Sequence, residues 1–316
     1  MAPGGPSATF EPGRLYRLKI AVILNPNAAG ARAGKFRTRL NRLLAEEAAR
    51  QPGSQWEVFE TGFSGHAVQI AAEQRDTGVD IIAAAGGDGT ISQCASSLVN
   101  SRTALSVIPL GTGNDFARTL NISGIEHGVQ TLFRGVRRAT DVGTANGRYF
   151  VNVAGCGFDA AVARRTNEGY KHFKGAMAYL AAVVECLGQF RPVNADILLD
   201  GKLVSGPIMM CSVANARYFG GGMRIAPEAQ IDDGMLDVCL IAGVGKLEFL
   251  AALPRVFNGS HVTHPSVTMH RCKQLTVSPG RSIPIFIDGE EAGITPVEFT
   301  VMPGALQVVM PQQLSR

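Results

Sequence analysis

Residues 79–99 read VDIIAAAGGDGTISQCASSLV, and their pattern decides the fold class of the chain. Residues 79–85 form an apolar run with the length and composition of a buried strand. From residue 90 to residue 99 the apolar side chains recur at helical spacing, which predicts a helix with one face toward a core. The glycines between the two segments permit a tight turn. A strand followed directly by a helix is the repeating unit of a parallel sheet.

The same alternation fills the first half of the chain. Two further helices are expected, one with Phe36, Leu40, Leu43 and Leu44 on a single stripe and one ending near residue 76. Strands alternating with helices argue for an α/β domain whose parallel sheet is covered on both faces. The other strands of this sheet are expected at residues 18–25, 56–61 and 105–111.

Beyond about residue 140 the pattern changes to short strands joined by Asp-Gly and Gly-rich turns. This pattern predicts a second, antiparallel domain of β-sandwich type, interrupted by helices at about 173–188 and 245–257. Residues 297–311 are expected to close the chain as a hairpin around Pro303-Gly304. The strands of this domain are expected within residues 149–155, 193–206, 207–214, 236–242, 267–278 and 282–291.

The division that follows is a flexible tail over residues 1–15, a first domain over 16–138 and a second over 139–296. The net charge of +4 is too small to predict nucleic-acid binding without a concentrated basic patch. Six cysteines without any close pair predict buried thiols rather than a metal or redox site. The N-terminus lacks the features of a signal peptide, and no apolar run is long enough to span a bilayer, so we expect a cytoplasmic protein.

Three glycine-containing loops follow predicted strands, at residues 25–30, 86–90 and 109–115. In an open parallel sheet such loops gather at one edge, where ligands bind, and glycine lets backbone N–H groups approach a phosphate. One such loop could reflect turn geometry alone, but three favour a phosphate ligand. Neither the dinucleotide motif nor the Walker motif is present. The carboxylate of Asp88 inside a phosphate loop makes sense if a divalent cation lies between them, with Asp115 in the neighbouring loop. The loops therefore predict a metal-bound nucleoside triphosphate.

Taken together, NPNAAG (25–30), AAGGDGTISQ (84–93), PLGTGNDFARTL (109–120), NARYFGGGMRIAPEAQIDDGMLDV (215–238) and FIDGEE (286–291) resemble the bacterial soluble diacylglycerol kinase family, which is related to sphingosine and ceramide kinases. The resemblance spans about residues 18–310. It implies a phosphofructokinase-like nucleotide-binding domain, completed by about residues 297–316, and a β-sandwich lipid-substrate domain, with the active site between them.

The resemblance also implies roles for individual residues. Glu290 matches the proton acceptor that takes the proton of the lipid hydroxyl, with Asp288 beside it; the alternative for this stretch is a plain hairpin turn. Asp88 and Asp115 would organise the catalytic Mg²⁺. The residues that would border ATP are Asn25, Pro26, Asn27, Thr61, Gly86, Gly87, Asp88, Gly89, Thr90 and Thr112.

The stretch QIDDGMLD (230–237) matches the structural magnesium loop of the family. Asp233, the Met235 carbonyl and Gln230 would be its ligands, although the family often has a more obvious oxygen ligand in place of Gln230. The alternative interpretation is a tight Asp-Gly turn between two strands.

An enzyme without a spanning helix that acts on a membrane lipid must bind the membrane surface. Two basic clusters are candidates for peripheral docking at the inner face of the membrane, unless they are simply solvated charges. The helix at 173–188 carries Phe173, Met177, Leu180, Val184 and Leu187 at core spacing, and we expect these side chains to be buried. The basic clusters are Arg32, Lys35, Arg39 and Arg42, and Arg164, Arg165, Lys171 and Lys174.

The sequence thus predicts an ATP- and Mg²⁺-dependent lipid kinase, with diacylglycerol as the favoured acceptor and no nucleic-acid partner. Other hydroxyl lipids, such as a sphingoid base, ceramide or polyprenol, stay open as acceptors. A kinase of the NAD kinase type and a nucleotide-binding regulator without catalysis are further alternatives. A homodimer through an exposed edge of the sandwich is compatible with the family but is not indicated by any motif.

Overall fold

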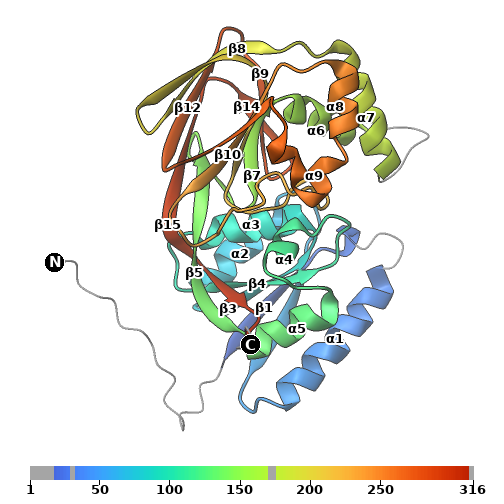
Figure 1. Ribbon diagram of the computed structural model, residues 1–316. Helices are drawn as coiled ribbons and strands as arrows, with labels where there is room; N and C mark the ends of the chain where they lie inside the picture. Colours follow the sequence, from blue (N-terminus) through green and yellow to red (C-terminus); the bar gives the residue numbers. More distant parts are fainter. Residues whose placement is uncertain (1–17, 29–32, 170–175, 313–316) are drawn as a thin grey trace, which may run out of the picture.

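The computed structural model describes residues 18–28, 33–169 and 176–312. The predicted tail of residues 1–15 lies outside this range. One continuous sheet runs through the molecule and is parallel at one end and antiparallel at the other (Figure 1). Its path is β14-β13-β7-β9-β8-β12-β15-β4-β3-β1-β2, with β5, β6, β10 and β11 branching from it. The mixed α/β architecture predicted from the sequence is confirmed.

The parallel part comprises β1 (Lys19–Leu24), β2 (Gln55–Glu60), β3 (Ile81–Gly86) and β4 (Ala104–Pro109). Side chains alternate between its two faces, so each face buries its own apolar cluster. One face packs on α2 (His66–Asp76), α3 (Asp88–Leu98) and α4 (Asp115–Thr119), while the other packs on α1 (Ala33–Ala49) and α5 (Ile125–Arg134). The predicted coverage of both faces is therefore correct.

The antiparallel part buries a core between its strands and a second apolar layer beneath its helices. Its helices are α6 (Phe158–Glu168), α7 (Ala176–Gln189), α8 (Lys246–Ala252) and α9 (Arg255–Asn258), with a 3-10 turn at Ser260–Thr263. Its strands are β5 (Val136–Ala145), β6 (Arg148–Phe150), β7 (Val153–Gly157), β8 (Val193–Leu199), β9 (Lys202–Ala214), β10 (Leu236–Ala242), β11 (Val267–Cys272), β12 (Gln274–Pro279), β13 (Pro284–Ile287) and β14 (Glu290–Ile294).

The predicted hairpin around Pro303-Gly304 is wrong. Residues 297–310 form a single strand, β15 (Val297–Met310), which pairs with β12, β5 and β4 and so joins the two parts of the sheet (Figure 1). The Pro-Gly pair produces a register shift against β5 between Met302 and Leu306 rather than a reversal. Gly304 has a φ of 63° and its N–H binds Asp141 Oδ1 at 2.8 Å. Because β5 continues alongside both ends of β15, a bulge absorbs the irregular residues.

Two other expectations need correction. The predicted strand at 149–155 is split into β6 and β7, because the N–H groups of Val151, Asn152 and Val153 bind the Asp288 carboxylate instead of a neighbouring strand. The helix expected at 245–257 divides into α8 and α9 near Pro254, which cannot donate a helical hydrogen bond.

On α7 the predicted apolar stripe is only partly correct. Leu187 is buried as expected, but Val184 is 54% exposed and Val183 takes its place in the core. Phe173 lies outside the described residues, as do the positions of the Met177 and Leu180 side chains. The helix is therefore rotated relative to the stripe that the sequence predicts.

Candidate active site

The three glycine loops lie together at the carboxyl ends of β1, β3 and β4, as the parallel sheet predicts. The Asn25 N–H binds Ala85 O at 2.9 Å, and the Asn25 side chain donates to Thr90 Oγ1 at 2.9 Å. The Leu110 N–H binds Gly86 O at 2.9 Å. Pro26, Asn27 and Thr112 lie in the same loops, and the Thr61 N–H binds Leu24 O beside them. The residues expected at the nucleotide thus share one edge of the sheet.

Two of the glycines are required because the loops touch each other. A Cβ on Gly111 would lie 2.7 Å from Gly87 Cα, and a Cβ on Gly113 would lie 2.6 Å from Asp88 Oδ2. Real Cβ atoms do not approach other atoms so closely. Part of the glycine content therefore serves packing of the loops against each other, in addition to any contact with a ligand.

Asp88 is the first residue of α3 and also binds the neighbouring loop. Its Oδ1 accepts the Asp115 N–H at 2.7 Å and the Phe116 N–H at 3.3 Å, so it satisfies the free N–H groups at the start of α4. Burial raises the pKa of Asp88, and these backbone hydrogen bonds oppose the rise. Oδ2 faces Gly113. Oδ1 of Asp88 thus holds the two loops together, and Oδ2 points toward the place where the loops meet.

Asp115 lies directly beside this point and is 5% exposed. Its Oδ2 accepts the Gly221 N–H at 2.9 Å, while its buried Oδ1 has no hydrogen-bond partner among the described residues. Burial, followed by the charge of Asp88, raises the pKa of Asp115 to about 6. A buried carboxylate oxygen without a donor is costly unless a cation or a proton reaches it. The pair Asp88 and Asp115 therefore fits the expected catalytic Mg²⁺, which commonly takes one or two carboxylates together with phosphate oxygens and waters.

Glu290 and Asp288 come from the turn between β13 and β14 and approach the same loop from the antiparallel part. Glu290 Oε1 lies 3.7 Å from the position a Cβ would take on Gly89, and the residue is exposed. Both oxygens of Asp288 are occupied: they accept three backbone N–H groups of residues 151–153, and Oδ2 also accepts Ser92 Oγ at 2.8 Å. Burial raises the pKa of Asp288 to about 6. In this geometry Asp288 ties α3 to the antiparallel part, and Glu290 is the carboxylate with room to meet a ligand.

A cleft of about 400 Å³ opens beside Asp288 and Glu290, and neither Asp88 nor Asp115 lines it. It contains Gly89 and Glu290, and its walls come from both parts of the sheet. Gln93, Arg148 and Tyr149 are among the lining residues that the sequence analysis missed. Gln93 stands four residues after Gly89 on α3, so helical spacing could have revealed it. Arg148 and Tyr149 are brought there by the β5–β6 hairpin, which the Asn146-Gly147 pair, with φ of 47° and 80°, could have revealed. The other lining residues are Ser64, Gly65, Val68, Ser92, Ser96, Ile287 and Asp288.

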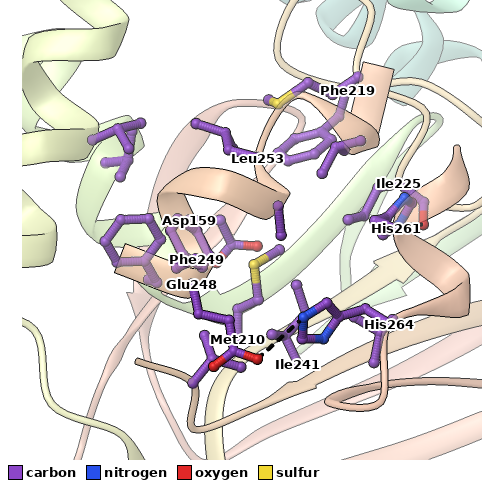
Figure 2. A pocket seen from close by; sticks show the side chains of 18 residues that line it. Asp159, Met210, Phe219, Ile225, Ile241, Glu248, Phe249, Leu253, His261 and His264 are labelled. Atoms are coloured by element: carbon purple, nitrogen blue, oxygen red, sulfur yellow. Dashed lines mark hydrogen bonds and ion pairs between the residues drawn. The ribbon is translucent and has the colours of Figure 1, made fainter. Parts of the chain in front are cut away.

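An apolar cavity of about 60 Å³ lies under the helices of the antiparallel part (Figure 2). Phe219 stands at one end of it in this view, and the ion pair between Glu248 and His264, at 3.3 Å, stands at the other. Gly221, whose N–H binds Asp115, follows Phe219 by two residues. The segment that lines one end of the cavity thus also contacts Asp115, although neither Asp88 nor Asp115 lines the cavity itself.

Asp159 is one of the few titratable groups in the lining of this mainly apolar cavity, together with Glu248, His261 and His264. It accepts Ser212 Oγ and the Ala160 N–H, each at 2.8 Å, and is 8% exposed. Burial raises the pKa of Asp159 to about 7. The sequence analysis did not single it out, because a lone aspartate at the start of a helix carries no motif.

The loop that resembles a structural magnesium site has a different arrangement. Asp233 Oδ1 accepts the Met235 N–H at 3.1 Å, and Asp233 Oδ2 is bound by the Arg271 guanidinium. In the part of the chain that the structure describes, no group of three or more His, Cys, Asp or Glu side chains is placed to hold a metal. Both oxygens of Asp233 are occupied by protein donors in this geometry, so a cation would have to displace Arg271, and the assignment of Asp233, Met235 and Gln230 as metal ligands stays a prediction.

The two basic clusters are partly neutralised. Arg39 pairs with Glu126 and Arg42 lies 3.7 Å from Glu46. Arg165 pairs with Glu185 at 2.9 Å, and Arg164 lies 3.9 Å from Glu291. Lys35 is exposed. Arg32, Lys171 and Lys174 lie outside the described residues, so the docking surface stays a prediction.

Comparisons with known proteins identify the family and support the fold. A family model described as the diacylglycerol kinase catalytic domain matches residues 19–145, and one described as the YegS C-terminal NAD kinase beta sandwich-like domain matches residues 152–310. A diacylglycerol kinase of Bacillus subtilis is 32% identical over 92% of this chain and 96% of its own length. One of Staphylococcus carnosus is 27% identical over 94% and 97%. A crystal structure of a Bacillus anthracis diacylglycerol kinase matches with a TM-score of 0.73 at 22% identity, over 93% of this chain and 97% of that one, which supports the fold.

Proposed function

The chain belongs to the bacterial diacylglycerol kinase family and is a lipid kinase, and we propose that it transfers the γ-phosphate of ATP to the free hydroxyl of diacylglycerol. The observation that carries this proposal is the approach of Glu290, from the antiparallel part, to the loop that contains Asp88. A phosphate-binding loop and a carboxylate with room for a ligand face each other across one cleft. This is the arrangement that phosphate transfer to a hydroxyl group requires.

In the proposed reaction Glu290 accepts the proton of the lipid hydroxyl while the hydroxyl oxygen bonds to the γ-phosphorus. The bond from that phosphorus to the bridging oxygen of ADP breaks, and the products are ADP and phosphatidic acid. Backbone N–H groups of the loop Gly86–Thr90 and the N-terminus of α3 would bind phosphate oxygens. When Mg²⁺ is bound by Asp88 and Asp115, it neutralises charge that develops on the phosphates.

The apolar cavity supports a lipid acceptor. It is lined mainly by apolar side chains of α6, α8, α9 and the strands beneath them, and Phe219 at one end lies two residues before Gly221, which binds Asp115. Such a lining favours an acyl chain because apolar surface gains free energy when it leaves water. A whole acyl chain is larger than this cavity. The proposal therefore requires either that the remainder of the acyl chain extends past α8 and α9 or that these two helices move apart.

One observation favours a second acceptor, a sphingoid base. The Asp159 carboxyl lies in the same cavity, where it could receive a hydrogen bond from an amino or second hydroxyl group. Diacylglycerol has no amino group and only one hydroxyl. Competition between the two lipids therefore distinguishes the candidates.

The test is to incubate purified protein with labelled ATP, Mg²⁺ and mixed micelles that contain diacylglycerol, sphingosine or ceramide, and to identify products by mass spectrometry. We expect phosphatidic acid as the main product. A phosphorylated sphingoid base in its place would move the substrate assignment to the second acceptor. Bound ATP with no labelled lipid in any reaction would contradict the proposal.

We also propose that the enzyme binds the membrane surface peripherally. No helix in residues 18–28, 33–169 or 176–312 is long and apolar enough to cross a membrane. The support comes from the basic residues on α1 and near α6, although ion pairs reduce their net charge. Binding to vesicles with and without anionic lipid tests it: equal binding to both would contradict electrostatic docking, and Lys35→Glu should weaken binding to the anionic vesicles only.

A further inference from the structure

The loop between residues 230 and 236 lies where the two parts of the sheet meet. Ile231 O accepts the Asp141 N–H at 2.6 Å, and the Gly234 N–H binds Asp141 Oδ2 at 2.6 Å. The other oxygen of Asp141 accepts the N–H of Gly304 at the bulge in β15. The conformation of this loop is therefore coupled to β5 and β15, the strands that connect the two parts.

A guanidinium group stands where the resemblance placed a cation. Arg271 contacts Asp233 Oδ2 through Nη2, and its Nε lies 3.7 Å from Asp237 Oδ1. The position of Arg271 is set by the β10–β11 pairing, in which it is the direct partner of Asp237. The two carboxylates thus share one permanent positive charge, supplied from the neighbouring strand.

We propose that Arg271 takes the place of a divalent cation in this loop, so that the loop keeps its conformation without metal. A guanidinium is always charged and donates several hydrogen bonds in one plane, which suits two carboxylates at once. Mg²⁺ requires oxygen ligands in near-octahedral geometry and gives up its waters reluctantly. With one oxygen of Asp233 bound to the Met235 N–H and the other to Arg271, an added cation would lose ligands and meet a like charge.

The proposal predicts what happens when Arg271 is removed. Asp237 is 4% exposed, and its buried Oδ2 has no hydrogen-bond partner among the described residues. Without Arg271, the Asp233 and Asp237 carboxylates would repel each other and each would present an open oxygen. The Arg271→Met variant should therefore acquire a requirement for a divalent cation that the natural chain does not have.

The experiment measures the Tm of the full chain without nucleotide, in EDTA and in Mg²⁺. For the natural chain we expect only the Tm difference that Mg²⁺ binding at Asp88 and Asp115 produces, and a response to Mg²⁺ in the variants means a change beyond it. For Arg271→Met in EDTA we expect a Tm about 2–4 °C below that of the natural chain, which corresponds to a loss of ~1 kcal/mol in the free energy of unfolding. In Mg²⁺ we expect most of this difference in Tm to disappear. Arg37→Met, which breaks the exposed ion pair with Glu60, is the matched control and should show no response to Mg²⁺.

Asp233→Asn separates this loop from the carboxylate pair at Asp88 and Asp115. A Mg²⁺-dependent rise in the Tm of the natural chain that disappears in Asp233→Asn would overturn the proposal, and so would an Arg271→Met variant with unchanged Tm in both conditions. A Mg²⁺-dependent rise in Tm that persists in Asp233→Asn arises at another site. In that case Arg271→Met should still show a larger Mg²⁺-dependent rise in Tm than the natural chain. If Arg271→Met does not fold, Arg271→Lys keeps the charge and should fold with a slightly lower Tm and no Mg²⁺ response; a Mg²⁺ response in that variant would also overturn the proposal.

Discussion

Two pairs of aspartates in this protein have opposite electrostatic surroundings. Asp88 and Asp115 lie where backbone N–H groups occupy only some of their oxygens, and one buried oxygen of Asp115 has no donor among the described residues. Asp233 and Asp237 lie beside the Arg271 guanidinium. The first pair leaves a position that a cation can fill, and the second already has its positive charge. Two carboxylates near each other therefore do not define a metal site until the groups that face them are known.

Among the variants that test this comparison, the largest effect on activity is expected at Glu290, which approaches the loop that contains Asp88. Glu290→Gln should leave ATP binding unchanged and lower kcat by about 10²- to 10⁴-fold, as is typical for loss of a general base. The measurement is kcat with diacylglycerol, together with ATP affinity by calorimetry. The neighbouring Glu291→Gln, which removes the contact with Arg164, is the control. Equal kcat values for the two variants would refute the role of Glu290.

The second effect concerns pH. Burial raises the pKa of Asp115 to about 6, from an ordinary value of 3.8, so below pH 6 the group is increasingly protonated and cannot bind a cation. At limiting Mg²⁺, where a proton competes with the cation for this carboxylate, activity should therefore fall about tenfold per pH unit below that value. Asp237→Asn should leave this profile unchanged, because that carboxylate is not at the reactive centre.

The titration of Asp115 itself does not cause such a loss of activity through unfolding. A carboxyl whose pKa is higher in the folded state binds its proton more tightly there than in the unfolded chain. Asp115 thus contributes stability that is fully present below pH 3.8 and lost as the pH rises through about 6. As the pH falls from about 6 to 3.8, the stabilising contribution of Asp115 to the free energy of unfolding therefore increases, while activity decreases. Parallel measurement of Tm and kcat across this pH range separates the two, and a pH-independent kcat would contradict the assignment.

The smallest effects are expected from two glycines, one beside each pair. Gly113→Ala would bring a Cβ within 2.6 Å of Asp88 Oδ2, so we expect both lower activity and a loss of about 1–3 kcal/mol in the free energy of unfolding. Gly234 has a φ of 72°, so Gly234→Ala should cost about 1–2 kcal/mol through backbone strain and leave kcat unchanged. Denaturant unfolding and kcat measured on both variants check this. Full activity in Gly113→Ala would mean that the position of Asp88 is not critical.

The sequence predicted what local patterns determine. The parallel strands, their helices and the three loops at one edge follow from apolar periodicity and glycine placement, and the structure places Asn25, Asp88, Thr90 and Asp115 accordingly. The approach of Glu290 to Gly89 was expected only through the resemblance to a family, since some 200 residues separate them in the chain.

The errors arose where distant segments decide the outcome. Pro303-Gly304 resembles a turn, but the partner strand β5 keeps β15 extended. The break after Phe150 depends on Asp288, which lies in a distant segment of the chain. In each case the local residues permit two structures, and a contact that is remote in sequence selects one.

The most direct test of this account compares Asp88→Asn with Asp233→Asn in the transfer of labelled phosphate from ATP to diacylglycerol. We predict that Asp233→Asn retains most of the activity of the natural chain, whereas Asp88→Asn loses at least about 10²-fold, because it removes charge at the reacting phosphates. Comparable loss in both variants would show that the Asp233 loop also holds a required cation. Full activity of Asp88→Asn would contradict the central claim that this carboxylate serves phosphate transfer.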